Sequence, residues 1–167
     1  KRVFLPTQPV PARRAQSQNN LQQMALPVDN YEAVHQEFPP GTLPNKDLEP
    51  EERLSWLVAV LPYIEQHALY QQFDLQEGWE AGENSAGTSI VLDLFLNPQA
   101  ALDPTVLTQQ QAEVGATHYV GIAGVGEKGP TLPVNDPQAG VFAYDRATRM
   151  RDIRDGTSNT LMISGIS

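Results

Sequence analysis

Three oxygen-bearing side chains near the C-terminal end of the sequence are the first candidates for chemistry. Asp152, Asp155 and Asn159 are spaced around a glycine in the pattern Asp-x-x-Asp-Gly-x-x-Asn. Carboxylate and amide oxygens are ligands of hard cations, so this turn predicts a candidate calcium site, completed by backbone carbonyls, water or distant residues such as Asp136 and Asp145. The alternative is an Asx-type turn whose side chains bond their own backbone and position the last strand.

A glycine-rich stretch from Gly124 to Gly129 has the spacing of a dinucleotide-binding turn and follows a strand-like segment. That chemistry requires a helix N-terminus directly after the glycines to receive the pyrophosphate. Pro130, Pro133 and Pro137 follow instead. We therefore interpret the stretch as a flexible loop between strands.

The sequence contains no recognisable pairing of a nucleophile with a base. Ser158 follows Asp-Gly-Thr, as around one class of protease nucleophile, but such a serine needs a base and an orienting carboxylate. His35, His67 and His118 occur singly, without the HExxH spacing of a zinc site. The acidic residues from Glu49 onward suit a solvated helix start. We predict that the protein is not an enzyme and requires no cofactor, calcium excepted.

Composition limits the class of partner. The chain has 167 residues, a formal charge of −9 and no cysteine. This length suits one domain with its own core, and the acidic balance argues against binding to nucleic acid, which requires a basic surface. The longest apolar run, Trp56 to Ile64, is far shorter than the ~20 residues of a membrane helix.

The elements that position these residues begin with a helix predicted over Leu54–Phe73. It should start near Pro50, a residue suited to a first helical turn. Pro62 predicts either a kink or an extended first half. The apolar residues share one helical face at Leu57, Val60, Leu61, Ile64 and Ala68.

The N-terminal part of the chain divides into an arm and a second helix. Residues 1–11 contain Pro6, Pro9 and Pro11, which predict an extended proline-rich arm, and residues 12–167 are predicted to form a single domain. From Ala12 the pattern is helical, and Pro27 predicts a kink within it. The residues expected to make contacts are the narrow helical stripe Leu21, Met24 and Val28, together with Trp79.

The later part of the chain predicts strands. Trp79 lies in a polar, glycine-rich loop, where packing onto the core is favoured over stacking on a ligand. Residues 105–114 could form either a short helix or a mobile loop. Because helices come first and strands later, we predict an α+β fold with N-terminal helices packed on an antiparallel sheet. The predicted strands are Ser89–Leu96, Thr117–Ala123, Gly140–Tyr144 and Asn159–Ile166. The first of these segments is too short to exclude a helix.

Taken in order, several strings resemble one family. They are ARRAQSQNNLQQ from Ala12, Asn30-Tyr31, FPPG from Phe38, LSW and LPYIEQHALYQQF within Leu54–Phe73, Trp79, Thr117-x-Tyr119 and IRDGTSNTLM from Ile153. The chain resembles the large planctomycete family of exported, prepilin-like proteins with a domain of unknown function. The resemblance implies a type IV pilin-like fold, export to the periplasm or cell surface, and prepilin processing. It implies no enzymatic activity.

These observations lead to two hypotheses. The first is a non-catalytic structural subunit of a pilin-like filament or cell-envelope complex, whose partners are copies of itself or other subunits of that complex. A membrane would be contacted only through an apolar N-terminal segment, which relatives of this kind carry and this sequence lacks. The alternative is a soluble exported module in which loops around Trp79 and Gly124–Gly129 bind a small solute or glycan, stabilised by calcium at the Asp152 turn.

Overall fold

The computed structural model describes residues 10–97, 115 and 117–166, and one long helix lies at its centre. This helix, α1 (Val10–His35), has 26 residues, a length of about 39 Å. It begins before the predicted start at Ala12, because Pro11 suits a first turn, where the N–H that proline lacks has no intrahelical partner. The helix continues through Pro27, whose ring is fully buried.

The chain leaves α1 through a left-handed residue and turns back onto the C-terminal part of the protein. Gln36 has φ 61°, and its N–H donates to the Glu32 carbonyl at 2.7 Å, a common way to end a helix. The N–H of Phe38 then donates to the Thr148 carbonyl, also at 2.7 Å. The FPPG string therefore joins α1 to residues more than one hundred positions later.

The helix predicted over Leu54–Phe73 is broken into short pieces, which corrects the prediction. Pro62 falls in the first turn of a 3-10 segment, and Glu65 adopts φ 62°, so the helix cannot continue through either position. The pieces are η1 (Pro50–Glu52), α2 (Trp56–Val60), η2 (Leu61–Ile64) and α3 (His67–Tyr70).

The strand predicted over Ser89–Leu96 is wrong. α4 (Gly82–Thr88) occupies the preceding residues, and η3 (Asp93–Phe95) interrupts the segment. Ile90 and Val91 are each more than 40% exposed. The pattern of apolar residues therefore wrongly predicted a buried strand in this segment. The short helix predicted at 105–114 lies outside the described residues.

The sheet of the described chain has two strands. β1 (Tyr119–Gly121) pairs antiparallel with β2 (Ile163–Gly165), and Val120 faces Ser164 in the register. Both lie within predicted strands. The segment 140–144 forms no strand of its own, although the Phe142 N–H donates to the Ile122 carbonyl at 3.2 Å.

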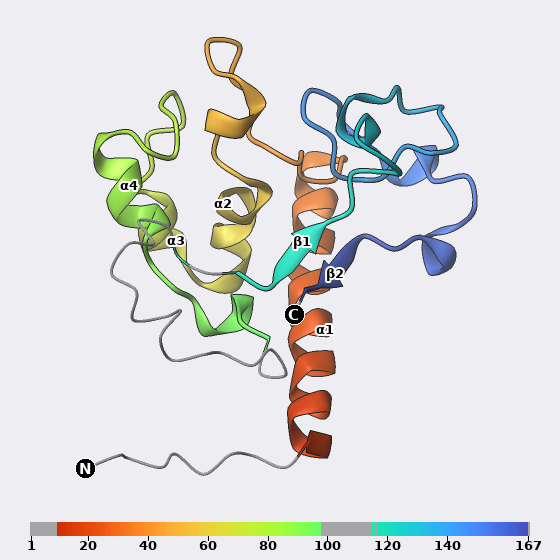
Figure 1. Ribbon diagram of the computed structural model, residues 1–167, viewed down its shortest axis with the longest axis horizontal. Helices are drawn as coiled ribbons and strands as arrows, with labels where there is room; N and C mark the ends of the chain where they lie inside the picture. The colour runs from red at the N-terminus through yellow and green to blue at the C-terminus, as the bar shows by residue number, and fades with distance from the viewer. Residues whose placement is uncertain (1–9, 98–114, 116, 167) are drawn as a thin grey trace.

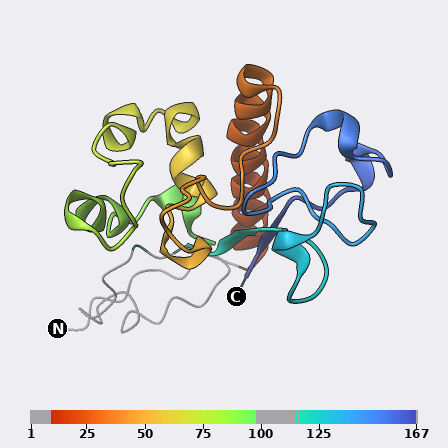
Figure 2. The same cartoon turned by 90° about the horizontal axis from the view of Figure 1, so that it is seen from above.

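Helices and a small antiparallel sheet together confirm the predicted α+β class at this coarse level. α1 contacts α2, η2, η3 and β2. Figures 1 and 2 both place it between α2–α4 on one side and the C-terminal loops on the other. Those loops contain the short turns η4 (Gly129–Thr131), η5 (Met150–Asp152) and η6 (Thr157–Asn159).

The core joins the two sides across α1. Met24 and Val28 of α1 are fully buried, and the Trp56 ring lies 4.9 Å from the Phe142 ring, centroid to centroid. Arg53 and Asp145 form an ion pair at 2.6 Å beside this contact between the two sides. Within the described ranges, no helix is both long and apolar enough to cross a membrane.

Candidate functional site

The three side chains predicted to bind calcium lie in neighbouring turns and are hydrogen-bonded within them. Asp152 accepts the Arg149 N–H at 2.9 Å, and Asp155 accepts the Thr160 hydroxyl at 3.1 Å. Asn159 donates its side-chain amide to the Asp155 carbonyl at 2.9 Å. These are the local bonds expected of the Asx-type alternative.

No group of three His, Cys, Asp or Glu side chains that could hold a metal ion occurs in the part of the chain that the structure describes. Of the two distant candidates, Asp145 pairs with Arg53, which lies between η1 and α2. Asp136 accepts the Gln138 N–H at 2.8 Å and lines the same cavity as Asp152 and Asp155. Calcium binding at this turn remains a prediction.

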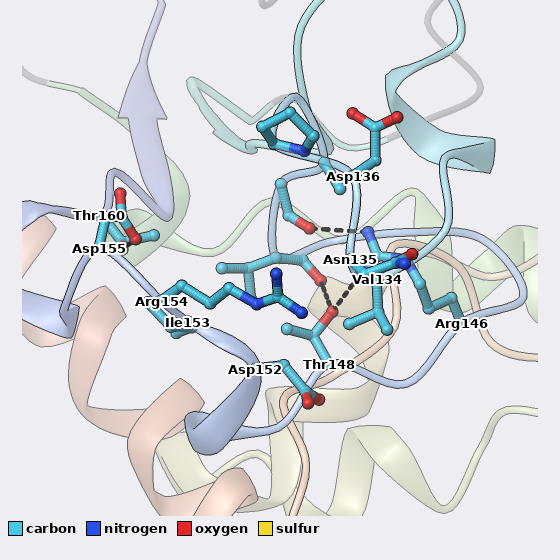
Figure 3. A pocket seen from close by; sticks show the side chains of 14 residues that line it. Val134, Asn135, Asp136, Arg146, Thr148, Asp152, Ile153, Arg154, Asp155 and Thr160 are labelled. Carbon is cyan, nitrogen blue, oxygen red and sulfur yellow. Dashed lines mark hydrogen bonds between the residues drawn. The ribbon is translucent and has the colours of Figure 1, made fainter.

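That cavity has a volume of about 500 Å³, opens to solvent and is lined by the loops that follow β1 (Figure 3). Its lining carries both signs of charge. The cations are Arg146 and Arg154, and the anions are Asp136, Asp152 and Asp155. The cavity therefore offers donors and acceptors together, as a small zwitterionic or polyhydroxylated molecule would require.

Arg146 is held in this cavity by hydrogen bonds to the protein. Its guanidinium donates to the Thr148 hydroxyl at 2.6 Å and to the Gly140 carbonyl at 2.8 Å, and Thr148 in turn donates to the Val141 carbonyl. Burial lowers the pKa of Arg146, and the nearby Asp152 carboxylate opposes that effect. The Nε of Arg146 is buried and has no hydrogen-bond partner among the described residues.

Trp79 packs onto the protein, as the favoured interpretation predicted. Its indole N–H donates to the Glu51 carbonyl at 2.8 Å, and its backbone N–H donates to the Glu52 carbonyl at 3.0 Å. The ring also packs against the core. These contacts fix the loop onto η1, and ligand stacking by this residue is not needed to explain its position.

Asn84 was missed by the sequence reasoning, although it is only 1% exposed. Its side-chain amide donates to the carbonyls of Asp74, Glu77 and Gly78, and its Oδ1 accepts the Asp74 N–H at 2.8 Å. The residue therefore holds the loop that leads to Trp79. A polar residue inside a glycine-rich helical stretch was the available signal.

The predicted contact stripe on α1 is largely internal. Met24 and Val28 are fully buried by the rest of the same chain, and Leu21 packs partly buried against the core. Leu26 and Val34, on other faces of the helix, are 61% and 66% exposed. A partner that contacts α1 in the folded domain would meet these two side chains.

The other motifs occupy structural positions. His118 accepts the Asn97 N–H through Nδ1 at 3.0 Å, and Ser158 is exposed in η6. The glycine stretch leads only into the three-residue turn η4, which supplies no helix N-terminus of useful length. Gly124 has φ 138° and lies against the backbone of Gln138, so the ends of the stretch are close-packed, whereas residues 125–128 are exposed.

A second cavity, of about 340 Å³, lies at the C-terminal end of α1. Tyr31 stacks on His35 with ring centroids 4.0 Å apart and meets Tyr63 edge-on at 5.9 Å. His35 Nε2 and the Tyr63 hydroxyl are 3.1 Å apart. Burial and the Glu37 carboxylate raise the pKa of Tyr31, and burial raises that of Tyr63. The other lining residues include Pro40, Pro44, Pro62, Tyr70 and Gln76.

No curated protein and no solved structure matches the chain. A family model, SBP_bac_10, described as "Protein of unknown function (DUF1559)", matches residues 11–166. The match covers α1, both cavities and both strands, so the chain belongs to this family of proteins of unknown function, DUF1559.

Proposed function

We propose that the protein is a non-catalytic structural subunit of a pilin-like filament or cell-envelope complex, exported to the periplasm or cell surface, and that it acts through protein–protein contacts. The observation that carries the proposal is the position of α1. Its later turns pack on the domain through Met24 and Val28, whereas its first turns extend beyond the other described elements (Figure 1). A long helix half attached to a small α+β domain is the arrangement implied by a pilin-like resemblance.

Exposed side chains on α1 add to this support. Pro11, Ala12 and Gln16 are exposed in its first turns, and Leu26 and Val34 are exposed farther along. Burying apolar area contributes roughly 25 cal/mol per Å², so two aliphatic side chains can strengthen a contact between helices measurably. The proposed partners are copies of this chain or other subunits of the envelope complex.

The test is the assembly state of the full chain. Sedimentation velocity over a range of concentrations should show association, which the double variant Leu26→Glu/Val34→Glu should weaken by about tenfold or more. The matched control is Gln22→Glu/Asn30→Asp, which adds the same charge to exposed positions of α1 without removing an apolar side chain. A protein isolated from its native source that is strictly monomeric and unassociated would contradict the proposal.

The second candidate is a soluble exported module that binds a small solute or glycan. The buried, unpartnered Nε of Arg146 favours it, because a ligand oxygen in the 500 Å³ cavity could accept that hydrogen bond. Titration with calcium, amino acids and sugars, followed by thermal unfolding, tests it. A ligand at 100 times its dissociation constant should raise the free energy of unfolding by about 2.7 kcal/mol. Loss of that shift in Arg146→Lys would place the ligand in this cavity.

A further inference from the structure

The tyrosine-lined cavity at the end of α1 has the chemistry of a groove for extended, proline-rich peptide. Its walls present the rings of Tyr31, Tyr63 and Tyr70. All three are half-buried, so each keeps an exposed surface. The stacking of Tyr31 on His35 and the contact between His35 and Tyr63 hold two of these rings in place without a ligand.

Such a groove suits a polyproline II segment for two reasons. Proline rings pack on aromatic faces, and the extended backbone has carbonyls without internal hydrogen bonds, which hydroxyl and amide donors can bind. Tyrosine hydroxyls and the side chain of Gln76 are such donors at this cavity. A segment with its φ angles already fixed by proline also loses little conformational entropy on binding.

The chain itself contains a matching segment ahead of α1. Pro6-Thr7-Gln8-Pro9 has the PxxP spacing, and the arm carries Lys1 and Arg2 without an acidic residue. The rest of the chain is strongly acidic, since the total formal charge is −9, and Glu37 lies near the groove. The other PxxP string, from Pro130, begins inside the 3-10 turn η4 and becomes extended only at Leu132, so it is not extended throughout.

Geometry separates the arm from the groove of the same chain. Tyr31 lies 21 residues after Val10 in one helix, which places it about 32 Å away along the axis. Pro6 precedes Val10 by only four residues, which span at most about 14 Å when fully extended. The two ends of α1 lie at opposite sides of the molecule in Figure 1. The PxxP segment therefore cannot reach its own groove.

We propose that the Pro6–Pro9 segment of one protomer docks in the groove formed by Tyr31, Tyr63 and Tyr70 of a second copy. The inference rests on the proposed assembly role and identifies one of its contacts. Because arm and groove are different surfaces, the contact is heterologous, and repeated copies form a ring or an open filament.

The test pairs two defective full-length chains. Pro6→Ala/Pro9→Ala keeps a groove but loses the arm motif, and Tyr63→Ala keeps the arm but loses a groove wall. Each alone should self-associate about tenfold more weakly than the wild type by sedimentation velocity, which corresponds to the loss of one anchoring contact. An equal mixture should form a heterodimer and stop there, because only one intact arm–groove contact is possible.

Controls separate binding from folding. Tyr63→Phe retains the ring and should retain most of the association, and equal melting temperatures would show that Tyr63→Ala is folded. Pro6→Ala/Pro9→Ala changes residues ahead of α1 and should leave the melting temperature unchanged. A mixture that forms no heterodimer, although the unmodified chain associates, overturns the arm–groove contact.

A labelled peptide covering residues 1–11 distinguishes this inference from the general assembly proposal. Fluorescence anisotropy should rise when the full wild-type chain is added, and the rise should be reduced about tenfold in affinity by Tyr63→Ala. If association persists in Pro6→Ala/Pro9→Ala and the peptide does not bind at about 1 mM, the arm contact fails and the assembly proposal stands. If the wild-type chain is monomeric and the peptide still does not bind, both fail.

Discussion

Residues 10–97 and residues 117–166 contribute to the same core by different means. The first region buries side chains presented by helices, such as Met24, Val28 and Val60. The second has only three-residue strands and turns, and it brings backbone segments into close contact at glycines such as Gly140. The comparison teaches that a region with little regular structure can be packed as specifically as a helical one. In the second region close contacts between backbone segments do what the apolar faces of helices do in the first.

The largest expected effect is at the point where the two regions meet. Phe142 is 1% exposed and packs on Trp56. Phe142→Ala should lower the free energy of unfolding by about 3–5 kcal/mol, because it leaves a cavity between the regions. Urea unfolding measures the loss, and Phe142→Leu, which keeps most of the volume, should cost less than about 1.5 kcal/mol. Equal losses in both variants would show that this contact is not tightly packed.

Gly140→Ala tests whether backbone contact organises the second region. A Cβ at this position would lie 2.4 Å from the Ile122 carbonyl oxygen and 2.5 Å from the Gly124 nitrogen, so backbone must move. We expect a loss of about 3 kcal/mol in the free energy of unfolding, at the upper end of overpacking effects.

The control for this glycine is Gly126→Ala. Gly126 has φ 77° and open space around its Cβ position, so only backbone strain of about 1 kcal/mol is expected. A Gly126→Ala variant as unstable as Gly140→Ala would remove the argument from close approach.

Asn84→Ala tests how the helical region holds its loops, because one side chain there binds several backbone carbonyls of the loop before α4. The variant leaves the carbonyls of Asp74, Glu77 and Gly78 without their donor, and we expect a loss of about 2 kcal/mol. Chemical denaturation and Trp79 fluorescence should both report it. Asn45→Ala removes two exposed bonds, one donated to the Gln76 carbonyl and one accepted from the Asp47 N–H, and should cost less than about 1 kcal/mol because water replaces both.

The smallest expected effect is a loss of folding stability at alkaline pH, caused by two tyrosines of the helical region. The pKa values of Tyr31 and Tyr63 are raised above 10.0 in the folded protein, chiefly by burial. The folded state therefore holds these protons more tightly, so the associated stability is fully present below the unfolded pKa near 10.0 and is lost as the pH rises through the folded values. Ultraviolet titration should show the shift, and Tyr31→Phe should remove part of it.

The sequence predicted features that depend on local chemistry. The helix from Ala12, the packing of Trp79 and the residues of β1 and β2 were accessible, because periodicity, a lone aromatic and turn residues each leave a local signal. The break in the helix predicted over Leu54–Phe73 could be predicted only in part. Pro62 indicates a break in the sequence, but nothing in the sequence indicates the left-handed conformation of Glu65. Tertiary contacts decide such a residue, and a single sequence does not contain them.

The candidate sites were less accessible for the same reason. Asp152, Asp155 and Asn159 formed a visible pattern, yet the cavity that they border is completed by Arg146 and its bond to Gly140, which no spacing rule connects. The aromatic groove draws Tyr31 from α1 and Tyr63 from η2. Residues from separate elements meet only after folding, whereas the PxxP arm that we propose as the ligand is visible in the sequence alone.

The contact between Trp56 and Phe142 also sets the order in which the domain can be completed during synthesis. Every α-helix of the described chain is finished by Thr88, long before Phe142 leaves the ribosome. Until then the nascent helical region exposes the apolar surface around Trp56, and distant contacts of this kind form slowly. A chain ending at Asn97 should therefore bind a hydrophobic dye that the full chain excludes. Completion of this core depends on the last third of the sequence.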